Sequence, residues 1–481
     1  MLKKIINNRQ LPFWFLSISI MFALTLPTLI KDGMFMDAML YTSVAHNLSC
    51  GIGTFWFPQF SLHNVAGLLS FHEQPPLVFG IQALFFKILG DSMYVERFYT
   101  FLTMVISAFL INKLWKSIFI KQPSYQKIGW LPILLWITIP VCFWSYSNNM
   151  HENTMGIFTL SSVFIYFRTV QTKKNELLGL ILTGVFIFLA TLSKGLPGFF
   201  PVFLPSLYWL SLKSVRLKKA LVQTFIIILI LCILYSILLS FPQSKESLSL
   251  YFFKRVLHRI NDFPTVENRF YILFRLLMEL LPQIIISIVV LLFVKHKKNG
   301  FETENQRKYM LFFFMIGVVS SLPLMLTLVQ KGFYFIPSLP FFAIGLSILI
   351  APRISPLIEH MEMNTKRYKF TLLTSFSLFI IVCTYSLVQK GKYSREKELL
   401  EDVYIIGKNI SKKEIISIPN NLWNEWSLQC YLARYHSISL DPNSLREYYL
   451  TLKNSNKENY PLGYKKVTID TKLYELYKKE N

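Results

Sequence analysis

Long apolar segments recur along this chain, and they constrain its fold more than any other feature of the sequence. A helix of roughly 20 apolar residues crosses the hydrocarbon layer of a membrane. Segments of this kind occupy residues 11–30, 97–118, 128–147, 154–171, 176–193, 196–212, 220–241, 271–294, 309–329, 333–351 and 370–388. Since 53% of the 481 residues are hydrophobic and only 16% are charged, an ordinary soluble fold is excluded. The sequence predicts a mainly α, polytopic membrane protein with about eleven spans.

The basic residues between these segments predict the orientation of the chain. With the N-terminus in the cytoplasm, the loops assigned to that side carry clusters of Lys and Arg, whereas the short outer loops at 148–153, 194–195 and 330–332 carry only Lys194 and Lys331. The run 77–89 contains Lys87 and is too short to cross. If it did cross, every later loop would invert, so we expect it to lie along the membrane surface.

The formal net charge of +23 could suggest binding to nucleic acid. Its Lys and Arg residues fall between apolar segments, and no nucleic-acid-binding module is recognisable, so no nucleic-acid partner is expected. From residue 390 onward charged residues become frequent. Here EIISIP and KVTID resemble strands, whereas LEDVYIIGKNI and LREYYLTLKN resemble helices. We therefore expect a transmembrane domain at 1–389, with a first outer loop at 31–96, and a small α/β outer domain at 390–481.

Two acids of the first outer loop are the leading catalytic candidates. Asp37 lies near the start of the predicted helix MDAMLYTSVAHNL, which has one apolar face and is expected at the membrane surface. Glu73 precedes Gln74-Pro75-Pro76, and the prolines restrict the backbone beside it. The alternatives stay open: Asp37 could be a helix cap or dipole partner, and Glu73 a solvated loop acid.

Further polar residues lie in or near the other predicted outer loops. Glu152 follows His151 in the turn NNMHENTMG, where a single acid can also be merely solvated. The remaining candidates could each neutralise a substrate phosphate or simply contact lipid headgroups; they are Lys194, Arg255, His258, Lys331 and Tyr334.

Carboxylates and cations at headgroup level suit the transfer of a group from a lipid phosphate. A carboxylate can accept the proton of the attacking group, and cations can neutralise the departing phosphate. No P-loop, GxGxxG or HExxH motif is present, so no cofactor is certain. Whether Asp37, Glu73 and His258 hold a divalent cation stays open at this point.

These segments carry a family resemblance. The segments that carry it lie within residues 11–350 and are MDAMLYTSVAHNLSCGIGTFWFP, HEQPPLVFGIQALFFKILG, HENTMG, LSKGLPG and KGFYFIPSLPFFA. They resemble bacterial GT-C glycosyltransferases of the protein O-mannosyltransferase and aminoarabinose transferase superfamily. The resemblance implies an inverting enzyme that moves a sugar from a polyprenyl-phosphate carrier to a lipid, glycan or protein acceptor. It places the reaction at the periplasmic face of the inner membrane, among membrane lipids, with the C-terminal domain periplasmic.

The resemblance also implies residue roles. Asp37 would be the catalytic carboxylate, Glu73 a residue of the active-site rim, Glu152 the second acid and Lys194 a lysine near the donor phosphate. Gln74 departs from the family pattern, which commonly has Lys there. We expect the four charged residues to gather in one pocket.

Two other function classes compete with the enzyme. A transporter or flippase of a lipid-linked sugar is expected to show repeated halves and broken helices at mid-membrane depth. The sequence shows neither. A membrane-anchored assembly factor without chemistry would tolerate Asp37→Asn.

Overall fold

The computed structural model describes residues 8–62, 70–257, 264–294, 303–453 and 461–480. The chain divides into two compact units. The first, here called the helical unit, comprises Met1–Pro27, Phe101–Ser147 and His151–Gln389. The second, here called the mixed unit, comprises Thr28–Thr100, Asn148–Met150 and Lys390–Asn481. The tail after residue 389 therefore belongs to the same unit as the first predicted outer loop.

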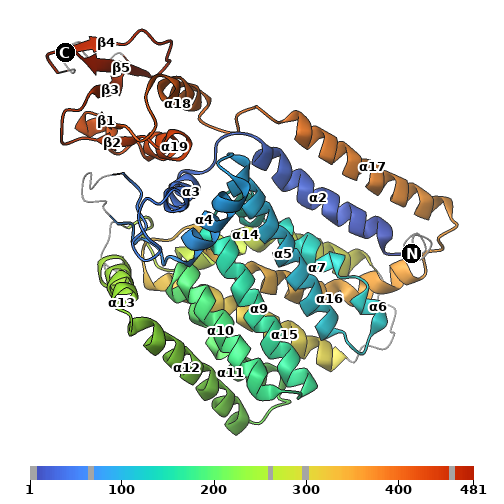
Figure 1. The fold of residues 1–481 in the computed structure, drawn as a ribbon. Coiled ribbons are helices and arrows are strands. Elements are labelled where there is room, and N and C mark those ends of the chain that lie inside the picture. The colour runs from blue at the N-terminus through green and yellow to red at the C-terminus, as the bar shows by residue number, and fades with distance from the viewer. Residues whose placement is uncertain (1–7, 63–69, 258–263, 295–302, 454–460, 481) are drawn as a thin grey trace. The chain divides into compact units, whose positions relative to one another are not determined.

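The helical unit is built from helices (Figure 1). Its longer helices are α2 (Leu11–Ile30), α5 (Tyr94–Ile118), α9 (His151–Thr172), α10 (Glu176–Lys194), α12 (Leu217–Leu239), α14 (Tyr271–Phe293), α15 (Thr303–Ser321), α16 (Leu339–Glu359) and α17 (Lys366–Val388). The end of α2 and the start of α5 are counted with the mixed unit. Shorter helical segments are α6 (Pro123–Gln126), α7 (Trp130–Ile137), α8 (Pro140–Tyr146), η2 (Leu196–Phe203), α11 (Leu204–Leu212), α13 (Pro242–Ser249), η3 (Leu250–Leu257), η5 (Leu322–Leu326) and η6 (Gly332–Phe335).

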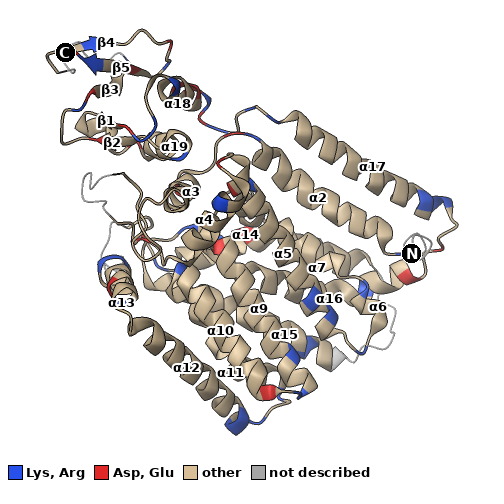
Figure 2. Ribbon diagram, viewed as in Figure 1, with Lys and Arg blue, Asp and Glu red and all other residues tan. Residues whose placement is uncertain are grey.

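Eight helices of the described residues are long and apolar enough to cross a membrane. They are Leu11–Ile30, Tyr94–Ile118, Glu176–Lys194, Leu217–Leu239, Tyr271–Phe293, Asn305–Leu326, Leu339–Glu359 and Lys366–Val388. Each coincides with a predicted span. Figure 2 shows that α2, α12 and α17 carry little charge along their length and that the Lys and Arg residues of α12 and α17 lie near one end. The chain is therefore a multi-pass membrane protein.

Three predicted spans are helical but are not among these eight. Residues 128–147 form the two short helices α7 and α8, because Pro140 begins the second helix and cannot donate a backbone hydrogen bond to the first. Residues 196–212 begin as the 3₁₀ helix η2, which contains Pro201, and continue as α11. The segment at 154–171 lies in α9, whose first turns carry polar side chains. Proline and polar residues thus explain the difference from eleven.

The packing of the helical unit centres on α16, the most buried of the eight helices. Helices α7, α14 and α15 pack against α16, and α10 packs against both α9 and α12. At the N-terminal helix, aromatic rings provide the contact with α17: Phe15 lies against Phe376 and Phe379, and Phe22 also contacts Phe379.

The mixed unit combines two helices of the first loop with the tail. Helices α3 (Met36–Ser49) and α4 (Leu77–Leu89) come from the loop, and the tail contributes α18 (Lys397–Asn409), η7 (Asn420–Leu422) and α19 (Trp426–His436). Its five strands are β1 (Ile415–Ser417), β2 (Ser439–Asp441), β3 (Tyr448–Leu452), β4 (Tyr464–Lys466) and β5 (Tyr474–Lys479), in the sheet order β2-β1-β3-β5-β4. Strand β1 is parallel to β2 and β3, whereas β5 is antiparallel to β3 and β4.

The small α/β tail domain is confirmed, but some of its predicted elements are wrong. LREYYLTLKN contains strand β3, because its aromatic and β-branched residues pair with β1 and β5 on both sides. KVTID overlaps strand β4 only at Lys466.

Helix α3 also differs from the prediction: residues 38–47 are all buried, on every face of the helix, since α4 and α19 pack against it.

Candidate functional site

Asp37 lies in the first turn of α3, as the sequence predicts. It does not cap the helix, because the N-cap position belongs to Phe35, whose backbone N–H donates to Asn148 Oδ1 at 2.8 Å. A carboxylate in the first turn faces the positive end of the helix dipole, which stabilises its ionised form. The half-buried Asp37 side chain lies directly before residues 38–47, which are all buried.

Helix α19 packs against α3 beside Asp37. The hydroxyl of Ser43 donates to the carbonyl oxygen of Cys430 at 2.9 Å, which ties the two helices together. Burial raises the pKa of the Cys430 thiol well above its ordinary value, and the negative charges of Asp37 and Glu396 raise it further. This thiol is therefore protonated and serves as a small core group.

The segment around Glu73 leads directly into α4. Glu73 is half-buried in a bend, and Pro76 is the N-cap of α4. Gln74 is buried, and its Nε2 donates to the hydroxyl of Tyr41 on α3 at 3.2 Å. The residue that departs from the family pattern therefore forms a neutral contact with the helix that carries Asp37. Asp37 and Glu73 both belong to the mixed unit.

The helical unit brings Glu152 and Lys194 together. The ammonium of Lys194, at the end of α10, lies 3.1 Å from Glu152 Oε1 in the first turn of α9. The Glu152 side chain is 1% exposed and that of Lys194 is 7% exposed. A buried ion pair is costly to form, and removing one partner leaves an uncompensated charge. The pair is therefore a buried polar contact between α9 and α10 of the helical unit.

Gly195 ends α10 directly after Lys194. Its φ of +82° lies in the region that favours glycine, and a Cβ at this position would be 1.8 Å from the Tyr251 hydroxyl on η3. The backbone N–H of Gly195 donates to the Thr191 carbonyl at 2.7 Å. The glycine thus allows η3 to lie against the end of α10, beside the lysine.

The other residues predicted to bind the donor phosphate do not lie on α9 or α10. Arg255 is half-buried on η3, Lys331 is the exposed N-cap residue of η6, and Tyr334 lies within η6. His258 lies outside the described residues. Beside η6 the structure adds Arg275, which sequence reasoning missed: a Cβ at Gly332 would lie 3.4 Å from its Nε, and its Nη2 pairs with Glu279 at 2.7 Å.

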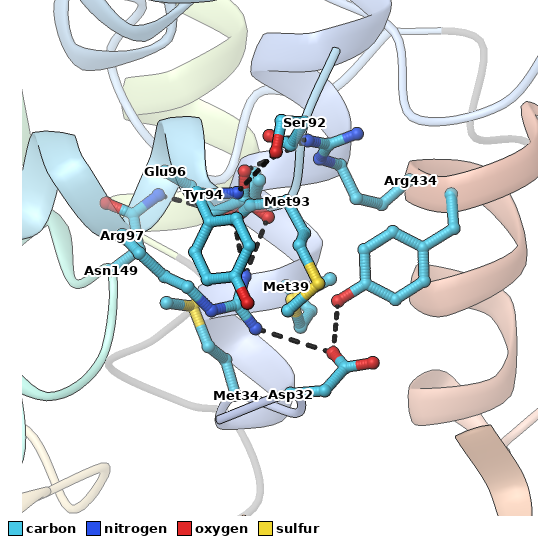
Figure 3. Close-up of polar contacts among 12 residues, drawn as sticks. Asp32, Met34, Met39, Ser92, Met93, Tyr94, Glu96, Arg97, Asn149 and Arg434 are labelled. Carbon is cyan, nitrogen blue, oxygen red and sulfur yellow. Dashed lines mark hydrogen bonds and ion pairs between the residues drawn. The ribbon is translucent and has the colours of Figure 1, made fainter. Parts of the chain in front are cut away.

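Sequence reasoning also missed a buried charge network in the mixed unit (Figure 3). Arg434 of α19 donates from Nη2 to Glu96 Oε2 at 2.9 Å, and Arg97 donates from Nη1 to Glu96 Oε1 at 3.2 Å. Arg97 also pairs with Asp32 at 3.4 Å. The Asp32 carboxylate accepts from the hydroxyls of Tyr404 and Tyr435 at 2.5 and 2.7 Å. Two arginines and two acids thus compensate each other away from water.

The network continues to the last turn of α3. Arg434 Nη1 donates to Asp91 Oδ1 at 3.0 Å, and His46 Nε2 lies 2.6 Å from the same oxygen. Burial by itself would raise the pKa of Asp91, but the hydrogen bond and charge of His46, together with Arg434, hold it below its ordinary value. The one available sequence signal was Glu96-Arg97 at the start of an apolar segment, where charges are costly unless paired.

Each of the three carboxylates of the network contacts an arginine, which suits a structural role, whereas Asp37, Glu73, Glu152 and Lys194 are the residues that the sequence predicts for chemistry. Among the described residues no group of three His, Cys, Asp or Glu side chains could hold a metal ion. The predicted divalent cation includes His258, which is not described, so that prediction stays open. A common pocket for the four charged residues also remains a prediction.

Known proteins resemble the chain in part of its sequence and in its fold. Residues 73–239 match the family model described as dolichyl-phosphate-mannose-protein mannosyltransferase. No curated protein sequence matches significantly. Two crystal structures of ArnT from Cupriavidus metallidurans, one bound to undecaprenyl phosphate and one apo, each superpose with a TM-score of 0.63. They are 12% and 10% identical, and each comparison covers 96% of this chain and 97% of the other.

At this level of identity the ArnT structures establish the fold. The agreement extends over almost the full length of both chains. The chain therefore has a fold like that of ArnT, and its residues 73–239 match a mannosyltransferase family model, as the suspected resemblance predicts.

Proposed function

We propose that the chain is a glycosyltransferase that takes a sugar from a polyprenyl-phosphate carrier and transfers it, with inversion, to a lipid, glycan or protein acceptor. The observation that carries this proposal is the combination of the mannosyltransferase family domain with the fold of ArnT, which binds undecaprenyl phosphate in its crystal structure. Both names describe proteins that handle a lipid-linked phosphate, and the multi-pass membrane helices of this chain suit such a ligand.

In the proposed reaction the acceptor oxygen or nitrogen attacks the anomeric carbon of the sugar. The bond between that carbon and the phosphate oxygen breaks, and the phosphate leaves with the electron pair. Asp37 accepts the proton of the attacking group. The ammonium of Lys194 neutralises charge on the phosphate, and Glu152, 3.1 Å away, orients that lysine. Glu73 acts as a rim acid.

The remaining candidates have supporting roles in the proposal. Arg255, His258, Lys331 and Tyr334 would contact the donor phosphate. The proposed location is a bacterial inner membrane with a cytoplasmic N-terminus and a periplasmic C-terminal domain. The distribution of Lys and Arg between the apolar segments supports this orientation.

A transfer assay tests the proposal. The purified chain in lipid nanodiscs is given a panel of radiolabelled polyprenyl-phosphate sugars and a bacterial membrane extract, and new glycosylated product is counted. We expect Asp37→Asn to lower transfer at least roughly a hundredfold, because a general base contributes about 10²–10⁴ in rate. Asp470→Asn, the same chemical change at an exposed residue, is the matched control and should transfer normally.

Two results would contradict the proposal. Equal transfer by wild type and Asp37→Asn would remove the catalytic role of this carboxylate. In sealed proteoliposomes, movement of the labelled lipid between leaflets without any new glycosidic product would instead support the transporter.

A further inference from the structure

A hollow in the tail part of the mixed unit has no role in the proposed reaction. Its volume is about 500 Å³, which lies within the range of small-molecule sites, roughly 300–1,000 Å³. It is lined by the residues that follow β1, by the loop from β2 to β3, and by Tyr449 of β3. The described lining residues are 417–421, 442–445, Tyr449 and Pro461, so the hollow is formed within the tail. We call it the edge hollow.

The sheet topology places the edge hollow where open α/β sheets bind ligands. Strands β2, β1 and β3 are parallel, and the hollow begins at Ser417, the last residue of β1. After β1 the chain goes to β2 on one side, whereas β3, on the other side of β1, pairs with the antiparallel β5, and the chain after β3 continues to β4 at the far edge of the sheet. A crevice outside the carboxyl ends of parallel strands, where the connections diverge, is the usual ligand position in such sheets.

Hydrogen bonds fix the loop after β2, which lines part of the edge hollow. The carboxylate of Asp441 accepts from the backbone N–H groups of Asn443 and Ser444 at 2.8 and 3.2 Å, and Arg446 donates to it from two nitrogens at 2.9 and 2.8 Å. The hydroxyl of Ser417 donates to the Ser444 carbonyl at 2.8 Å. The loop after β2 is therefore held in one conformation before any ligand arrives.

The lining has the chemistry of a carbohydrate site. Asn420 and Asn421 after β1, and Asn443 after β2, present exposed side-chain amides. Each amide offers donors and an acceptor, which suits the hydroxyls of a sugar. Leu445 and Tyr449 add apolar surface that suits the C–H face of a sugar ring. Polar groups that fix orientation beside apolar surface are the usual composition of a small-molecule site.

The charges around the edge hollow argue against other ligand classes. None of the described lining residues is Lys, Arg, Asp or Glu, although the whole chain carries a net charge of +23. Arg446 is nearby, but its guanidinium is already paired with Asp441. The described lining residues therefore offer no counter-charge to a phosphate or carboxylate ligand and no acidic ligand to a metal ion. A neutral, hydroxyl-rich ligand fits these residues best.

We infer that the edge hollow binds a neutral carbohydrate. Asn420 and Asn443, on its two sides, would hydrogen-bond the sugar hydroxyls. The inference concerns binding alone and does not depend on the proposed transfer reaction, since none of the residues proposed for that reaction lines the hollow.

A binding experiment without any donor tests the inference. The full-length chain in nanodiscs is titrated with maltotriose, mannotriose and chitotriose, and with a heparin tetrasaccharide as an anionic comparison, using saturation-transfer NMR and biolayer interferometry. We expect at least one neutral trisaccharide to bind with a Kd of about 1 mM or tighter. The double variant Asn420→Ala/Asn443→Ala should weaken that binding at least about fivefold, the scale of a lost hydrogen bond of about 1 kcal/mol.

Asn424→Ala, which truncates another exposed asparagine of the same tail outside the hollow, is the matched control and should bind like wild type. Because the truncated residues are exposed, the unfolding temperatures of all variants should agree. Three results would overturn the inference: no binding of any neutral trisaccharide by wild type, equal binding by wild type and the double variant, or binding of the anionic probe alone.

Discussion

At the residue scale, the Glu152–Lys194 pair is the clearest charged feature of the helical unit. Buried ion pairs can be purely structural, and truncation of either partner alone then destabilises the fold. In a catalytic pair the lysine also acts in the transfer reaction. Removing both charges together then recovers the stability of the fold but not the transfer activity. A double-variant experiment separates the two roles.

We predict that Glu152→Gln and Lys194→Met each lower the free energy of unfolding by about 3–5 kcal/mol, because each removes one partner of a buried ion pair. The double variant Glu152→Gln/Lys194→Met should recover most of that stability, but it should not recover transfer. Thermal unfolding in detergent and the transfer assay provide the two measurements.

The exposed pair of Lys219 and Glu176, at 2.7 Å, is the matched control for this cycle. Its side chains are 47% and 30% exposed, so its removal should cost no more than about 1 kcal/mol and leave transfer intact. If the buried double variant regained wild-type transfer, the pair would be structural only.

Asp91 provides a pH-dependent prediction. Its pKa in the folded chain lies below the ordinary 3.8. Between the two pKa values the unfolded chain binds more protons than the folded chain. The contribution of Asp91 to stability is therefore fully present above the ordinary pKa and is lost as the pH falls through the lowered pKa of the folded chain. Because its side chain is 56% exposed, the contribution should stay below about 1 kcal/mol.

The unfolding temperatures of wild type and Asp91→Asn, measured at a series of pH values from 2 to 6, check this sign. We expect the advantage of wild type to grow as the pH rises through the acid range and then to level off. An advantage that shrinks with rising pH would mean that His46 and Arg434 do not stabilise the ionised carboxylate.

At the element scale, the end of α10 decides where Lys194 lies. Gly195 combines a positive φ with close approach of Tyr251, and both features follow from the way η3 lies against this helix end. A side chain at residue 195 would disturb the backbone and the contact together.

We therefore predict that Gly195→Ala lowers stability by about 1–3 kcal/mol through backbone strain, with a further loss of transfer as the end of α10 shifts. Tyr251→Phe in the same chain should recover part of both, because the hydroxyl is the atom that an added Cβ would meet at 1.8 Å. Gly391→Ala is the control for strain alone: its φ is +79°, but nothing lies within 4 Å of its added Cβ. Wild-type transfer by Gly195→Ala would contradict this account.

At the scale of the whole molecule, the mixed unit joins segments that are distant in the chain. Arg434 and Glu96 lie 338 residues apart, yet their ion pair is almost completely buried. The tail and the first loop belong to one compact unit in which α3, the helix of Asp37, is buried, so we expect them to unfold as one cooperative unit.

We predict that Arg434→Met increases hydrogen exchange in α3 as well as in α19, because it removes one of the two ion pairs of the buried Glu96 and the bond to Asp91. Hydrogen exchange measured by mass spectrometry reports both helices in one experiment. Lys466→Met, which breaks the exposed pair with Glu475, is the control and should change neither helix. Faster exchange confined to α19 would contradict the idea of one cooperative unit.

The sequence by itself determined the features that depend on local pattern. Eight spans follow from length and apolarity, α4 has the predicted bounds 77–89, and Asp37 lies in the first turn of its predicted helix. Helical periodicity and chain-breaking prolines act over a few residues, so they can be read from one segment. The superfamily resemblance likewise came from short motifs around the candidate acids.

Only the tertiary structure decided which distant groups meet. The Glu152–Lys194 contact, the network through Arg434, the strand at 448–452 and the edge hollow each require partners brought together by the fold. The burial of α3 on every face is of the same kind, because α19 comes from the far end of the chain. Charge pairing and strand pairing depend on distance in space, whereas the sequence records only separation along the chain.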